Sequence, residues 1–179
     1  MFNTKRLTMG AFFIAMGIFL PMIFHALSLG KVFLPMHIPV LLAGFLCGPI
    51  IGAIVGALTP ILSALLTGMP PLMPPMAQMM IFELGVYGAL TGLFYETLRW
   101  KVVPSLLLSM VGGRIIYGLL GYTLLPLIGL NKISILYPLT AGLLTSLPGV
   151  IIQLVLIPTI IYLGERATGY RQDKAENSI

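Results

Sequence analysis

Long apolar runs separated by short charged turns are the feature that most constrains this chain. The run that follows Lys5 and Arg6 extends from residue 7 to about residue 27 without a further lysine, arginine or acidic residue. About 20 helical residues, at 1.5 Å each, cross the hydrocarbon core of a bilayer. Of the 179 residues, 58% are hydrophobic and 8% are charged, whereas about a quarter of a soluble domain is charged. The composition therefore predicts an all-α integral membrane protein and excludes an ordinary soluble domain.

The number of spans depends on the stretch from residue 38 to residue 66. As one helix it would be about 43 Å long, which is too long for one untilted span. Gly48 and Pro49 offer a break, because proline cannot complete the preceding helical bond but fits the first turn of a new helix. With this break there are six spans, and most basic residues collect on one side, as the positive-inside rule requires. The expected spans are 7–27, 38–48, 50–66, 76–98, 103–125 and 139–164, the second being short.

Basic residues set the expected orientation of these spans. The formal net charge is +5, and its lysines and arginines cluster at the ends of apolar runs. Such residues act as topology signals, so both termini are expected in the cytoplasm and no nucleic-acid partner is expected. Glu96, Arg99 and Trp100 are expected to anchor a cytoplasmic turn at the bilayer surface. Residues 1–166 form the expected membrane domain, and residues 167–179 form a polar cytoplasmic tail.

Glycines recur every four residues across the expected break, at Gly44, Gly48, Gly52 and Gly56. This spacing permits close backbone approach, so the second and third helices are expected to be buried and tightly packed. The segment 67–75 that follows holds four prolines and cannot be helical throughout. It is expected to be a stiff apolar loop, either a lid over a binding site or a loop in the lipid interface.

Strongly polar side chains are rare in the expected spans, and three of them lie at similar depth. Glu83, Arg114 and Gln153 come from three different helices. An arginine at the bilayer centre costs about 2.5–3.5 kcal/mol even on the gentler scales, so Arg114 needs a partner, and its long side chain can reach the depth of Glu83. Two readings remain open: a structural ion pair with Gln153 bonded nearby, or an outward-opening pocket for a polar ligand.

In the pocket reading, the arginine attracts an anionic or carbonyl group and the glutamate accepts hydrogen bonds from hydroxyl or amide donors. Further polar side chains on the outer half would fix the orientation of the ligand. The candidate ligand-binding residues are Glu83, Arg114, Gln78, Tyr87, Tyr117, Gln153, His37 and Asn131.

Other kinds of chemistry find little support in the sequence. The chain has no His-Glu-x-x-His motif, no aspartate within the expected spans, two histidines far apart and a single cysteine. Catalytic residues, a metal site and a bound cofactor are therefore not expected. A stand-alone proton-coupled carrier stays open because Glu83 could titrate, although such carriers usually contain internal repeats and none is evident. No nucleotide-binding loop motif occurs, so any ATP dependence must come from partner subunits.

Small residues form a low-relief face near the start of the first predicted helix. Ala11 and Ala15 lie one turn apart, next to Gly10. Such a face lets another helix come close. The residues leave open whether that helix belongs to this chain or to a partner protein.

Several segments resemble the substrate-binding S components of energy-coupling factor (ECF) vitamin transporters. They cover nearly the whole chain and read HIPVLLAGFLCGP, GALTPILSALLTGMPP, FELGVYGALTGLFY, GGRIIYG and SLPGVIIQLVLIP. The stretch from Ala11 to Ala15 also matches the Ala-x-x-x-Ala motif of the family's first helix. The resemblance implies a multi-pass protein of a bacterial-type cytoplasmic membrane, docked through this face on a T transmembrane subunit with two ATPase subunits. It also implies transport by toppling of the whole S component.

The family takes many vitamins, and the polar residues favour one type. Arg114 favours a ligand with a carboxylate, while Glu83 and Gln78 suit hydroxyl and amide donors. Pantothenate has all three groups, and the chain resembles the pantothenate-type branch. A thiamine-precursor pyrimidine, pyridoxine or niacin is the alternative ligand.

Overall fold

The computed structural model describes residues 3–26, 33–72, 76–127, 129–131, 134, 136, 138 and 140–168, and the elements within them are all helical. They are α1 (Thr4–Ala26), α3 (His37–Cys47), α4 (Pro49–Thr67), α5 (Met76–Gly92), the π-helical turn η1 (Leu93–Thr97), α6 (Val102–Leu127) and α7 (Ala141–Thr168). Among these, α1, α4, α5 with η1, α6 and α7 are long and apolar enough to cross a membrane. The expectation of an all-α membrane bundle with a short second helix is confirmed. That helix, α3, has 11 residues and is about 16 Å long by helical rise.

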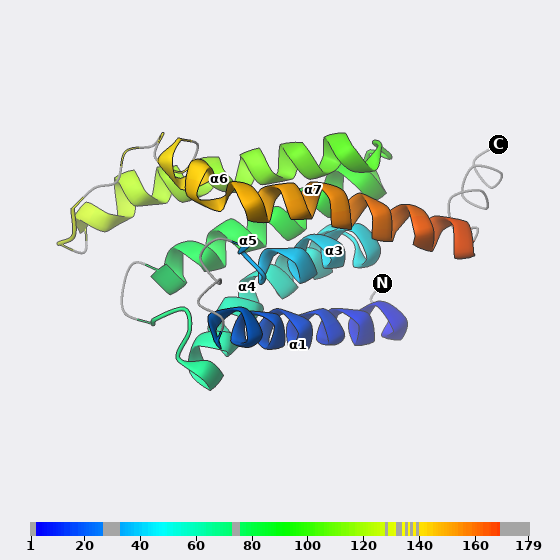
Figure 1. Cartoon of the computed structure of the whole chain (residues 1–179), viewed down its shortest axis with the longest axis horizontal. Helices are drawn as coiled ribbons and strands as arrows, with labels where there is room; N and C mark the ends of the chain where they lie inside the picture. Colours follow the sequence, from blue (N-terminus) through cyan, green and yellow to red (C-terminus); the bar gives the residue numbers. More distant parts are fainter. Residues whose placement is uncertain are drawn as a thin grey trace.

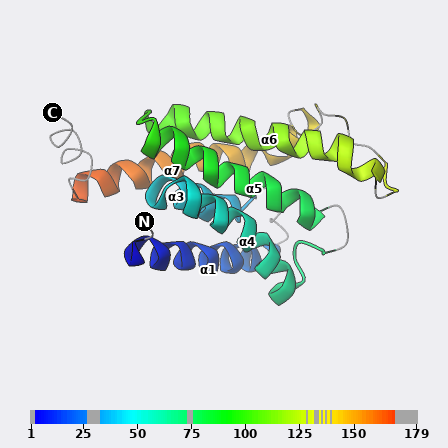
Figure 2. The same ribbon diagram turned by 180° about the vertical axis from the view of Figure 1, so that it is seen from behind.

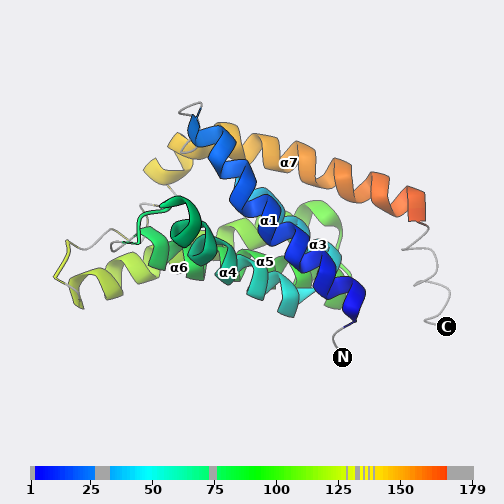
Figure 3. The ribbon, with the colours of Figure 1, turned by 90° about the horizontal axis from the view of Figure 1, so that it is seen from below.

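The helices lie side by side and alternate in direction along the bundle (Figure 1). Helix α5 packs against α3, α4 and α6, and the reverse view shows it between α4 and α6 (Figure 2). Helix α1 packs on α3 and α4, and it crosses the bundle at an angle when seen from below (Figure 3). The start of α1 and the end of α7 lie at the same end of the molecule (Figure 1). The two described chain ends therefore face the same side of the bundle.

The break between α3 and α4 occurs at the predicted glycine and proline. Gly48 has a φ of +88°, a conformation that favours glycine, and Pro49 opens α4 at its first position. A Cβ at Gly48 would lie 2.2 Å from Oε2 of Glu96, so a larger residue here would also displace that carboxylate. Both backbone conformation and space therefore require glycine at the break.

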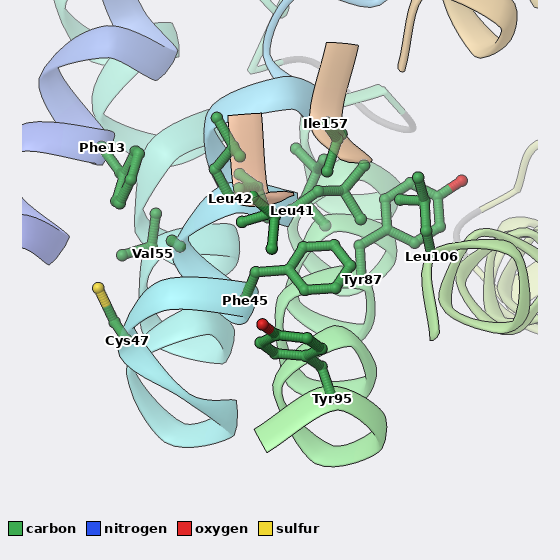
Figure 4. Packing of buried hydrophobic residues seen from close by; sticks show 14 of the residues in the cluster. Phe13, Leu41, Leu42, Phe45, Cys47, Val55, Tyr87, Tyr95, Leu106 and Ile157 are labelled. Atoms are coloured by element: carbon green, nitrogen blue, oxygen red, sulfur yellow. The ribbon is translucent and has the colours of Figure 1, made fainter. Parts of the chain in front are cut away.

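The glycine ladder packs against the backbone of α5. A Cβ at Gly52 would lie 2.4 Å from the carbonyl oxygen of Gly88, and one at Gly56 would lie 2.1 Å from that of Leu84. These helices approach each other more closely than any side chain would allow. The resulting core includes nine buried residues of α3 and side chains from each neighbouring helix, as seen around Leu41 in Figure 4.

An ion pair that the sequence did not indicate joins three elements at one end of this core. Arg6 at the start of α1 pairs with Glu96 in η1, and its Nη1 donates to the carbonyl oxygen of Cys47 at 3.5 Å. Arg6 was expected to be a topology signal and Glu96 an interfacial anchor. The pair also links α1, the end of α3 and η1.

The end of α7 differs from the sequence expectation. The predicted span of 139–164 is observed as Ala141–Thr168, so the helix continues past Gly164. Within this added turn, the Tyr95 hydroxyl donates a hydrogen bond to Glu165. This contact ties the added turn to η1. The predicted tail from residue 169 onward lies outside the described residues.

Replacing Gly56 with alanine should destabilise the protein by about 1–3 kcal/mol, because the added methyl group overpacks a contact with backbone that cannot move aside. Thermal unfolding of the purified protein in detergent measures this change. Gly164→Ala is the matched control, since a Cβ there meets nothing within 4 Å. Equal unfolding temperatures for the two variants would contradict the close packing of α4 on α5.

Candidate ligand-binding site

An ion pair between neighbouring helices lies at the centre of the site. Glu83 of α5 is 2% exposed, and its Oε1 lies 3.4 Å from Nη1 of Arg114 on α6. The pairing of these two residues meets the requirement that a charge buried in an apolar bundle be compensated. The separation exceeds the 2.7–2.9 Å of a closed charge-assisted hydrogen bond. The two groups therefore attract each other without being fully engaged.

Tyr87 extends this pair toward α3. Its hydroxyl donates to Oε1 of Glu83 at 3.0 Å, from one turn further along α5. Its ring packs on Gly113 of α6, where a Cβ would lie 2.1 Å from the ring. The ring centroid also lies 5.3 Å from that of His37 at the start of α3. A small residue on α6 thus lets Tyr87 bridge three helices.

Ser146 extends the pair in the other direction, toward α7. Nη2 of Arg114 donates to Oγ of Ser146 at 3.2 Å, and this hydroxyl donates to the Gly142 carbonyl oxygen of its own helix at 2.8 Å. Ser146 was not among the predicted site residues. One sequence signal could have identified it. Ser146 lies seven residues before Gln153, which places the two side chains on the same face of the helix, two turns apart.

We call His37, Tyr87, Glu83, Arg114 and Ser146 the polar chain, since each contacts the next in that order. Its members come from α3, α5, α6 and α7. A guanidinium offers five N–H donors in a planar fork, and the described contacts use two of its nitrogens. The fork can therefore also bind a carboxylate, which it matches in shape and charge.

Two buried side chains, one in the polar chain and one further along α7, have no hydrogen-bond partner in the part of the chain that the structure describes. They are His37, through both ring nitrogens, and Gln153, through both its amide oxygen and its amide nitrogen. Gln153 is 0% exposed. Leaving such a group buried and unsatisfied costs about 1–3 kcal/mol, so an occupant that bonds to it would recover this free energy.

The remaining predicted residues have other surroundings. Gln78 donates through Nε2 to the carbonyl oxygen of Leu72 at 2.9 Å, which ties the proline-rich loop to the start of α5. Tyr117 is half-buried on α6, three residues beyond Arg114. Asn131 is exposed after the end of α6, and none of the described contacts connects it to the polar chain. Among the described residues, no group of histidine, cysteine, aspartate and glutamate could hold a metal ion.

The small residues near the start of α1 divide between two sides of the helix. Gly10 and Gly17 face α4, where added Cβ atoms would lie 2.9 Å from Ile51 and 2.4 Å from Thr59. Ala11 and Ala15 are exposed on the other side of α1. The sequence left open whether these alanines pack within this chain or on a partner protein. In the described part of the protein, they do not take part in packing within this chain.

An apolar helical bundle whose buried polar groups meet at one place is typical of a small membrane protein that binds a polar solute. The chain matches the family described as "ECF transporter, substrate-specific component" over residues 5–161. It therefore belongs to this family, and it is a multi-pass membrane protein that acts as a substrate-specific component. No curated protein gives a significant match. No solved structure does so either.

A double-mutant cycle should show that Glu83 and Arg114 are coupled. We expect Arg114→Met to lower the unfolding temperature, because it leaves the Glu83 carboxylate uncompensated, and Glu83→Gln to restore part of the loss when added to it. Residues in contact typically couple by about 0.5–3 kcal/mol. Unfolding of the single and double variants in detergent measures this term. Strictly additive effects would show that the pair carries no net interaction.

Proposed function

We propose that this chain captures a water-soluble vitamin at the polar chain, with pantothenate as the best candidate, and delivers it to an ATP-driven import complex. The observation that carries the proposal is the arginine fork, which uses two of its nitrogens in the described contacts, in a bundle where His37 and Gln153 are buried without hydrogen-bond partners in the described part of the chain. The bundle would lie in a bacterial-type cytoplasmic membrane with both termini in the cytoplasm. The excess of basic residues at that end supports this orientation.

The chemistry of the site supports an acid that also carries hydroxyl and amide groups. Arg114 would bind the carboxylate, and Glu83, with Tyr87 beside it, would accept hydrogen bonds from hydroxyl or amide donors. Pantothenate combines these groups in one molecule. Niacin shares only the carboxylate, whereas pyridoxine and a thiamine-precursor pyrimidine would leave Arg114 without an anion.

The surface of α1 supports a role as a subunit. Exposed Ala11 and Ala15 would dock on a T transmembrane subunit that couples to two ATPases. The sequence contains no nucleotide-binding loop, so we propose that the chain is not itself an enzyme and that its partners hydrolyse ATP. A stand-alone secondary carrier is the second candidate, because Glu83 is a buried carboxylate that could carry a proton. Uptake into vesicles without any ATPase would favour that carrier.

Binding of a vitamin panel to the purified protein tests the ligand. We expect calorimetry to show pantothenate binding, and the double variant Glu83→Gln/Arg114→Met to bind it about 10- to 100-fold more weakly, since hydrogen bonds to charged groups contribute about 1.5–3 kcal/mol. The double variant removes both charges together, so it leaves no buried charge uncompensated. Asn131→Ala is the control and should bind as the wild type does. Selective binding of an uncharged vitamin would show that the site does not recognise a ligand carboxylate.

Enlarging the exposed face of α1 tests docking. Ala11→Leu/Ala15→Leu should abolish copurification with the T subunit and ATPases, because bulky side chains keep a partner helix at a distance. Vitamin binding should be unchanged, since these side chains point away from the bundle. Thr159→Leu, on an exposed face of α7, is the matched control. Normal copurification of the double variant would place the docking surface elsewhere.

A further inference from the structure

A buried amide lies on α7, two turns beyond the serine that bonds to Arg114. Gln153 belongs to a buried stripe along one face of this helix, between Ser146, which bonds to Arg114, and Ile157 in the apolar core. The stripe comprises Ser146, Gly149, Gln153, Ile157 and Ile161. An amide in the middle of such a stripe is costly unless something bonds to it.

Helix α3 carries the second buried side chain without a hydrogen-bond partner among the described residues, His37. Helices α3 and α7 are in contact and run in the same direction (Figure 1). Ile157 of α7 and Leu41 of α3 both belong to the buried core, and Figure 4 shows them in the same part of it. One turn back from these residues lie Gln153 and His37, each four residues earlier in its helix. The two buried side chains without hydrogen-bond partners among the described residues thus lie on two helices in contact, each one turn before a core residue.

We propose that Gln153, together with His37, recognises a neutral part of the ligand that carries a hydrogen-bond donor and an acceptor side by side. An amide group and the edge of an aminopyrimidine both have this pattern. The inference rests on the proposed function, because it assigns the second end of the ligand whose anionic end binds Arg114. It adds a determinant of specificity that the ion pair cannot supply.

The primary amide of Gln153 determines which chemical groups of the ligand can bind to it. A primary amide offers N–H donors and a carbonyl acceptor, so its best partner presents the reverse pattern. No described contact places a charged group at Gln153, and a charged ligand group bound there would be desolvated without compensation. Ser146 and Gln153 are seven residues apart, which is roughly 10 Å along a helix. The ligand would thus be held at two points by groups of different character.

Removal of the amide tests the inference in two ways. Gln153→Leu keeps the approximate size of the side chain, so the unfolding temperature of the ligand-free protein should stay equal or rise once an unsatisfied amide is gone. A clear fall would show that Gln153 is bonded within the fold and would overturn the inference. Thr159→Val, on the exposed side of α7, is the control for this measurement.

Binding of matched ligands gives the second readout. We expect Gln153→Leu to bind pantothenate at least 10-fold more weakly, and the wild type to lose a similar factor when an ester oxygen replaces the amide N–H of pantothenate. The variant should then discriminate little between amide and ester. The same binding measurement is made with a thiamine-precursor aminopyrimidine. If this pyrimidine is the ligand, Gln153→Leu should weaken its binding by a similar factor.

The outcomes separate the two proposals. Wild-type binding that Gln153→Leu leaves unchanged overturns the inference, while the proposed site at Arg114 stands. If the wild type binds neither probe, the proposed ligands are wrong, and the unfolding temperature decides the inference. In that case an equal or higher temperature for Gln153→Leu supports it, and a lower temperature overturns it.

Discussion

Inside a bundle that is otherwise apolar, the guanidinium of Arg114 must be compensated, and Glu83 of the neighbouring helix supplies the opposite charge 3.4 Å away. This requirement sets the relative depth of α5 and α6 and the rotation of their facing sides. Tyr87 and Ser146 bond to the two members of the pair and thereby bring α3 and α7 into the same arrangement. The candidate site is thus a consequence of satisfying one buried charge.

Close backbone packing makes this arrangement possible. Glycines of α3 and α4 lie against the backbone of α5 at Leu84 and Gly88, next to the turn that carries Glu83 and Tyr87. Gly113 leaves room for the Tyr87 ring on the opposite side. Helix α5 is therefore held on both sides by residues without side chains, and its polar groups have a fixed direction.

Much of the fold followed from sequence, since hydrophobic runs are set by bilayer thickness and the break at Gly48 by backbone chemistry. The need of Arg114 for a partner, and the choice of Glu83, also followed, because few alternatives exist at that depth. Gln153 was predicted as a polar group of the site, and the structure adds that its amide is buried without a partner among the described residues. Asn131 was also predicted as a site residue, but none of the described contacts connects it to the polar chain. Hydropathy does not constrain the depth of a loop residue, so the sequence could not place it.

The sequence by itself determined where the helices begin and end to within a few residues, which charges are costly, and the family to which the chain is similar. Tertiary structure alone decided the contacts of His37 with Tyr87, of Arg114 with Ser146 and of Arg6 with Glu96. Hydropathy fixes the depth of a residue along one helix, but it does not fix the rotation of that helix against its neighbours. Contacts between distant segments depend on that rotation, which the packing of the whole bundle sets.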